Sequence, residues 1–213
     1  MILIDLIVKF MAVVMLSLAA IAATTALLGN RIRAIQLFMG PVVFEARFRH
    51  LHIRVGLLPL GGFIEPVKAP YDEWGFWKSA VSSLSGVAAL LIISVVVVGP
   101  DHTIGRLLTN AVKLLLGAFS PLAVGKYCVA DGISFLSSAS PMESLAGIAV
   151  LFASFNLLPI PALPVGTLLL RLVAKAGELS PALVERIMVT GAMISLMGWI
   201  LWLVAAVTWL FTK

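Results

Sequence analysis

Charged residues and cysteine are both scarce in this chain. Only 12% of its 213 residues are Asp, Glu, Lys or Arg, against about 25% in an ordinary soluble domain. The single cysteine, Cys128, excludes an internal disulfide and a cysteine-rich zinc site. Hydrophobic residues make up 61% of the chain. This composition excludes a disordered protein and a soluble globular enzyme, and it indicates a membrane protein with several crossings.

Four long apolar stretches are predicted to be membrane helices, because a crossing needs about 20 apolar residues. They are residues 3–28, 77–98, 143–159 and 186–211. The first is too long for the apolar part of a signal peptide and lacks a cleavage motif, so we expect it to be retained. Gly99-Pro100 ends the second, and Pro159 with Pro161 ends the third.

Two segments between these helices have patterns of their own. Residues 41–64 alternate between apolar and polar side chains with the period of two that predicts a β-hairpin, with its turn around His50. Its backbone must be paired or shielded from lipid, so we expect the hairpin at the membrane interface or sheltered by helices. Residues 104–118 form an amphipathic pattern that predicts a helix on the bilayer surface, the alternative being a core-facing helix.

The net charge of +5 is interpreted through membrane topology rather than through a nucleic-acid partner. Seven Lys and Arg residues lie within 29–79, and the connection between the third and fourth helices is also basic. Basic residues favour cytoplasmic loops. We therefore expect the first and third connections to be cytoplasmic and both termini to be on the other side. The expected location is the bacterial inner membrane.

Five short motifs follow one another in a specific order along the chain. They are Leu-Phe-Met-Gly-Pro at 37–41, Leu-Leu-Pro-Leu-Gly-Gly-Phe at 57–63, Trp77-Lys78, Phe-Asn-Leu-Leu-Pro-Ile-Pro-Ala-Leu at 155–163 and the segment 179–186. Together they resemble the site-2 protease family, the zinc intramembrane metalloproteases. The resemblance implies a single membrane domain over residues 1–213, with a membrane-associated hairpin after the first helix and a lipid bilayer around it.

The resemblance fails at the residues that carry the family's chemistry. Family members place H-E-x-x-H on the first helix, where two His hold Zn²⁺ beside a Glu general base. Without a gap, this motif falls on Ser17, Leu18 and Ile21. Two shifted registers place it on Ala19, Ala20 and Ala23, or on Ala22, Ala23 and Ala26. The family's third ligand, an Asp, falls on Pro164. As written, the chain is not expected to bind catalytic zinc.

Zinc ligands elsewhere in the chain are few. His50 and His52 would face one side of a strand, but no third ligand lies within sequence reach. Cys128, Asp131 and His102 are a weaker combination. In the family an Asn on the third helix contacts the substrate backbone, a role that the resemblance carries to Asn156. The alternative is that Asn156 bonds a neighbouring helix.

Three functions are left open by the sequence. The first is a non-catalytic protein that binds a transmembrane segment of another membrane protein, through an edge strand and the cleft beside it. The residues expected to bind are Leu58, Pro59, Leu60, Gly61, Gly62, Phe63, Asn156, Pro159 and Pro161. The second is an intramembrane zinc metalloprotease, acting in regulated intramembrane proteolysis, whose active-site residues have been replaced. The third is a structural subunit of a membrane complex.

Overall fold

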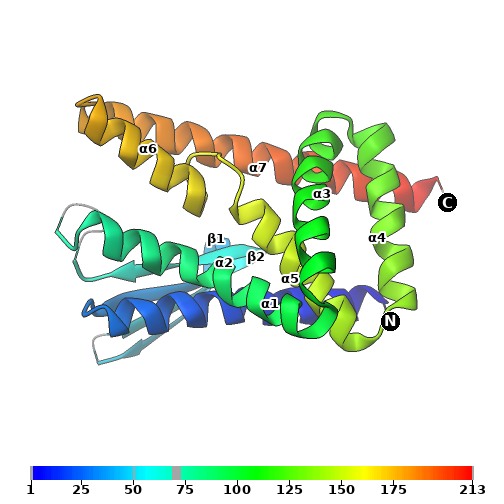
Figure 1. The fold of residues 1–213 in the computed structure, drawn as a ribbon, viewed down its shortest axis with the longest axis horizontal. Helices are drawn as coiled ribbons and strands as arrows, with labels where there is room; N and C mark the ends of the chain where they lie inside the picture. Colours follow the sequence, from blue (N-terminus) through cyan, green and yellow to red (C-terminus); the bar gives the residue numbers. More distant parts are fainter. Residues whose placement is uncertain (1, 50, 69–72, 213) are drawn as a thin grey trace. The chain divides into compact units, whose positions relative to one another are not determined.

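The computed structural model describes residues 2–49, 51–68 and 73–212, without the side chains of residues 2, 3, 39 and 58–60. Most of these residues are helical, and one small antiparallel sheet interrupts the helices (Figure 1). The chain forms two compact units, one built from Leu3–Leu90 and the other from Leu91 onward.

Three helices are long and apolar enough to cross a membrane, as the sequence predicts. They are α1 (Ile2–Leu27), α2 (Phe76–Val98) and α7 (Pro181–Phe211). The predicted crossing at 143–159 corresponds to α5 (Pro141–Asn156), which has only 16 residues. At 1.5 Å per residue it measures about 24 Å, less than the ~30 Å hydrocarbon core. The multi-pass membrane character is therefore supported by three helices.

The first unit combines α1 and the start of α2 with a sheet of two long strands, β1 (Ile32–Phe48) and β2 (Leu51–Pro66). Both strands change partners along their length. Residues 44–48 pair with 51–55, while residues 34–37 pair with 52–55 on one side and with 62–65 on the other. The strand pairing therefore begins nine residues before the predicted hairpin at 41–64. The predicted turn at His50 lies outside the described residues.

The base of the sheet is the end that holds the pair Ile32 and Pro66. This end is hydrogen-bonded to the ends of the two helices. The Asn30 side chain exchanges two hydrogen bonds of 3.1 Å with the backbone of Lys68, one donated by each partner. The indole N–H of Trp74 donates to the carbonyl of Leu28 at 3.3 Å. These contacts connect the end of α1 with the end of β2 and with the start of α2.

The second unit contains helices α3 to α7. The predicted amphipathic helix 104–118 is α3 (Pro100–Phe119), and it packs mainly against α5. Helices α4 (Lys126–Ser138) and α6 (Pro164–Ala176) and the π-helical turn η1 (Pro121–Gly125) were not predicted. Within this unit, the indole N–H of half-buried Trp202 on α7 donates to the carbonyl of Leu114 on α3 at 3.1 Å.

Candidate functional site

The face of α1 that should carry the family's H-E-x-x-H motif packs closely against α2. Ser17 is 7% exposed, and Thr25, two turns further on, shares a buried hydrogen bond of 2.6 Å with Ser82 of α2. One turn beyond Ser82, a Cβ atom at Gly86 would meet the hydroxyl of Ser17 and would lie 3.0 Å from Ile21. Small residues allow this approach, as is usual between membrane helices.

The same face of α1 also meets the sheet. Leu18 is 6% exposed, and a Cβ atom at Gly62 would lie 2.7 Å from Leu18 Cδ1 and against the backbone carbonyl of Gln36. Gly62 belongs to the Leu-Leu-Pro-Leu-Gly-Gly-Phe segment. Two glycines from separate parts of the chain, Gly62 and Gly86, therefore pack against all three motif positions of the ungapped register, Ser17, Leu18 and Ile21.

This packing distinguishes the three possible registers of the missing motif. In the ungapped register, Ser17, Leu18 and Ile21 all face neighbouring elements. In the shifted registers, Ala19, Ala23 and Ala26 are exposed, and Ala20 and Ala22 are half-buried. The ungapped register is thus the one that places every motif position on a packed face.

The residues at these positions do not fit a zinc ion. A serine hydroxyl and two aliphatic side chains replace the imidazole nitrogens and the carboxylate that the chemistry requires. Throughout the described ranges, no group of three His, Cys, Asp or Glu side chains is gathered to hold a metal. Pro164 begins α6 at its first helical position, where the fixed φ of proline favours helix initiation.

The motif 155–163 forms a tightly packed turn between α5 and α6. The amide nitrogen of Asn156 donates to the carbonyl of Phe152 in its own helix at 2.8 Å. The ring of Phe155 lies 5.4 Å from that of Trp199 on α7. A Cβ atom at Gly191 of α7 would meet the backbone of Pro161, so the glycine lets α7 approach the turn. Pro159 is exposed and Pro161 half-buried.

The other predicted binding residues lie along β2. Gly61 is buried with φ of +127°, a conformation that favours glycine, and Phe63 is 47% exposed. The side chains of Leu58, Pro59 and Leu60 lie outside the described residues. According to the register, residues 62–65 have partners only among 34–37. Within the described sheet, this part of β2 is therefore an edge strand.

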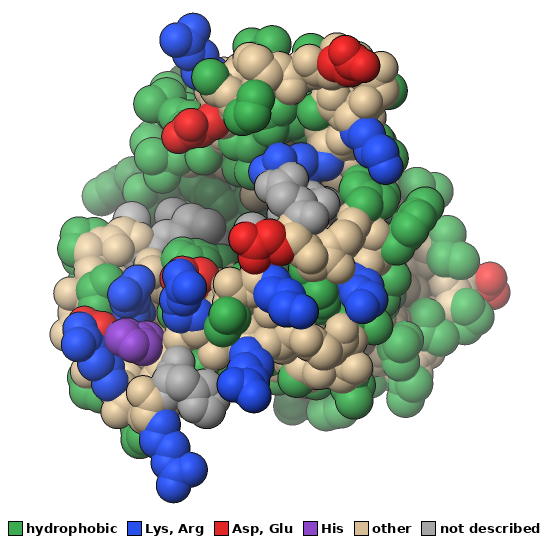
Figure 2. Space-filling view, turned by 90° about the vertical axis from the view of Figure 1, so that its left-hand side faces the viewer, with side chains coloured by type: hydrophobic (Ala, Val, Ile, Leu, Met, Phe, Trp, Pro, Cys, Tyr) green, Lys and Arg blue, Asp and Glu red, His purple; other side chains and the backbone are tan. Residues whose placement is uncertain are grey.

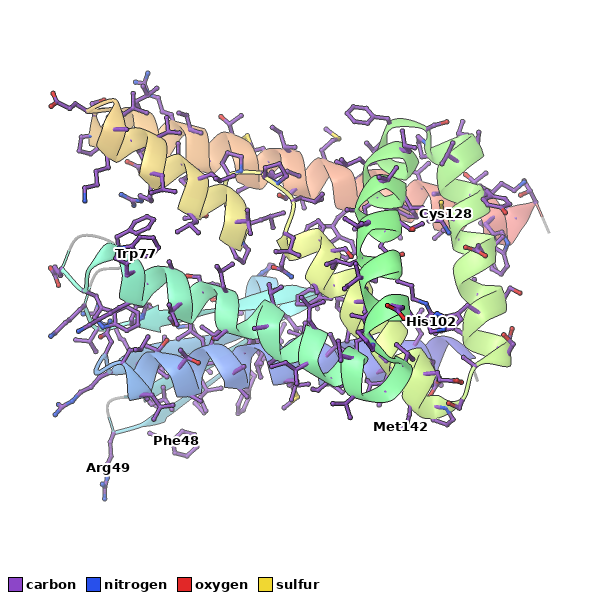
Figure 3. All side chains as sticks on the ribbon, viewed as in Figure 1. Phe48, Arg49, Trp77, His102, Cys128 and Met142 are labelled. Carbon is purple, nitrogen blue, oxygen red and sulfur yellow. The ribbon has the colours of Figure 1, made fainter. Side chains whose placement is uncertain are left out.

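Two of the remaining candidate metal ligands, His52 and Asp131, lie in ion pairs with other side chains. His52 Nδ1 lies 3.6 Å from Glu45, and Lys113 donates to Asp131 at 2.7 Å. Burial raises the pKa of the Cys128 thiol on α4. Figure 3 shows His102 and Cys128 on different helices of the second unit. His50 lies outside the described residues.

The architecture is that of a membrane protein in which an apolar helix is followed by a sheet and a second apolar helix. The sequence model of peptidase family M50, the site-2 protease family, matches residues 20–199. That match covers most of the chain, so the chain belongs to this family. No curated protein sequence matches it.

Sequence reasoning missed the polar seam between α1 and α2. Ser79, Ser82 and Gly86 recur at intervals of three and four residues on α2, and Ser17, Ile21 and Thr25 recur every four on α1. Such spacing places small and polar residues on one face of each helix. One such face on each of the two helices would have predicted that α1 and α2 pack closely against each other.

We predict that Gly86→Ala destabilises the protein by about 1–3 kcal/mol, because the added methyl group overpacks the contact with Ser17 and Ile21. Gly198→Ala on α7 is the matched control, since no atom lies within 4 Å of a Cβ built there. That variant should be neutral or more stable by up to about 1 kcal/mol. Denaturant unfolding in detergent micelles measures both, and equal stability of the two variants would contradict the packing described.

Proposed function

We propose that this member of the M50 family binds a transmembrane segment of another membrane protein without cleaving it. The observation that carries the proposal is the packing of Ser17, Leu18 and Ile21 against Gly86 and Gly62. In the ungapped register, these three positions are the ones that would hold a zinc ion and its water in a catalytic relative. Hydrolysis by the family's chemistry requires an activated water at those positions.

The binding half of the proposal rests on the edge of the sheet. Residues 62–65 of β2 have strand partners on one side, which leaves backbone groups available to an added strand. Pro66 ends β2 directly beyond them, and proline within a sheet is confined largely to edges and strand ends. An extended segment of a partner would add to the sheet here, beside the exposed ring of Phe63.

The loss of catalysis predicts a low metal content. After zinc loading and desalting, the purified detergent-solubilised protein should hold far less than one zinc per chain, because its motif positions supply no ligand. Mass spectrometry of the metal checks this. One tightly held zinc per chain would contradict the proposal, and His52→Ala and Cys128→Ser variants would then locate the ion.

Partner binding is tested by placing a charge on the edge strand. Phe63→Lys should abolish crosslinking of membrane proteins to a photoreactive residue at position 64, because an edge lysine opposes strand addition. Phe48→Lys is the matched control: Phe48 is also an exposed aromatic side chain, at 62%, but it lies on the opposite edge of the sheet, the segment 44–48 that pairs only with 51–55. It should leave crosslinking unchanged.

The captured species distinguish binding from cleavage. We expect integral membrane proteins of full length, in equal amount whether or not a zinc chelator is present. Fragments cut within a transmembrane segment would overturn the non-catalytic proposal. Equal loss of crosslinking in both lysine variants would overturn the assignment of the edge.

The proposal includes a topology of four crossings, with α5 and the turn after it forming the third. Residues 157–163 are uncharged and would extend the 16-residue helix toward the far boundary. Reporter fusions that are active only outside the cytoplasm should be active after residue 139, inactive after residue 178 and active at the C-terminus. Activity after residue 178 would show instead that α5 does not cross.

A further inference from the structure

The sheet of the first unit has one charged end and one uncharged end. Residues 34–44 and 55–64 contain no charged side chain, and they include the segments around 38–41 and 57–61 where the strands change partners. The pairing of Ala34 with His52 places the 48–51 turn beside the base of the sheet, near Ile32 and Pro66. All the charged residues of the sheet therefore lie toward this base end or between it and the middle.

The base end lies where two membrane helices meet a single boundary. The hydrogen bond from Trp74 to Leu28 joins the start of α2 to the end of α1, and both helices are candidate membrane spans. The Asn30–Lys68 hydrogen bonds fix the sheet to the same place. Trp77, one residue into α2, is exposed there, as aromatic side chains at membrane interfaces commonly are (Figure 3).

The charge at this end is mostly positive and only partly neutralised. Residues 31–68 hold six Lys and Arg and two Glu, and Glu73 directly precedes Trp74 at the same end. Glu65 pairs with Arg33 at 3.2 Å, and Glu45 pairs with Arg47 at 3.3 Å and lies 3.8 Å from Arg54. The hydrogen bond from Arg47 lowers the pKa of Glu45, so this carboxylate is charged at neutral pH. Among the described residues, no ion pair involves Arg31, Arg49 or Lys68.

These three unneutralised cations are exposed, and one of them projects from the end of the sheet. Arg49 lies in the turn between β1 and β2 with φ of +54°, next to exposed Phe48, and both side chains point away from the ribbon (Figure 3). Figure 2 shows many Lys and Arg side chains, with a few Asp and Glu among them, on the face that it draws. An exposed ring beside a cation suits the headgroup region, where the ring can enter the apolar layer.

We infer that Arg31, Arg49 and Lys68 bind the phosphate headgroups of anionic lipids while the uncharged end of the sheet lies in the bilayer. Clusters of basic residues directly beyond a membrane helix attract anionic lipids through their charge. The apolar end supplies a second attachment, so the cations remain at headgroup level rather than extending into water. This lipid site is independent of the proposed capture of a partner segment.

A fluorophore at the end of the sheet tests the inference. The full chain carries Cys128→Ser and Phe48→Cys, with the dye on the new cysteine, and is reconstituted in phosphatidylcholine vesicles. A minor fraction of the lipid is brominated, either as phosphatidylglycerol or as phosphatidylcholine. Local enrichment of the anionic lipid should make quenching by brominated phosphatidylglycerol about twofold stronger. Raising the salt from about 0.1 M to about 1 M should remove this excess.

Two matched triple variants distinguish an effect of these three cations from an effect of the protein's net charge. Arg31→Gln, Arg49→Gln and Lys68→Gln together should equalise quenching by the two brominated lipids. Lys126→Gln, Lys175→Gln and Arg186→Gln remove the same charge from the second unit and should preserve the excess. Equal quenching in the starting protein, as expected if these cations serve an acidic soluble protein, would overturn the inference. So would equal loss in both variants, or an excess insensitive to salt.

Discussion

The close approach of α1 to its neighbours is the constraint on which the first unit depends. Gly86 admits Ser17 and Ile21, and Gly62 admits Leu18, so helix and sheet meet α1 without an intervening side chain. In a membrane, burial from water supplies no force between helices, and association depends on close packing and on hydrogen bonds such as Thr25–Ser82. Three positions on this face of α1, Ser17, Leu18 and Ile21, are thus used for structural packing.

This packing also shows why Ser17, Leu18 and Ile21 are compatible with a stable fold without a metal. A buried imidazole or carboxylate without a metal or a polar partner would be costly to keep in an apolar setting. Leu18 introduces no such group, and Ser17 is small enough to lie against Gly86. In the ungapped register, all three motif positions therefore carry residues that pack well without a metal.

Much of the fold could be predicted because hydrophobic length and periodicity are local properties. The helices ending at Leu27, Val98 and Phe211 lie close to their predicted limits. The strand pairing before residue 41 could not be predicted, since residues 34–40 lack alternation and residues 34–37 have strand partners on both sides. Helix α6 was missed because Pro164 was considered as a lost ligand rather than as a helix start.

The candidate site was less predictable than the fold, for a physical reason. The absence of His and Glu could be read directly, but residues 19–26 are so rich in alanine that no register stood out. The correct register is indicated by two glycines that are distant in sequence. Their role becomes visible only in the folded structure, where Gly62 and Gly86 pack against the same part of α1. A motif position without its usual side chain carries no local sequence signal of which residues pack against it.

The way in which each end of the sheet is held in place bears on any binding role. A strand edge can accept a partner only if the sheet is held at a defined depth and angle, because strand pairing fixes register through backbone groups. The Asn30 and Trp74 hydrogen bonds fix the base against the helix ends, and the uncharged segments favour an apolar environment at the other end. A sheet held in this way presents residues 62–65 at a constant position relative to α1. That rigidity, rather than a reactive group, is what a protein needs in order to hold a membrane segment without cutting it.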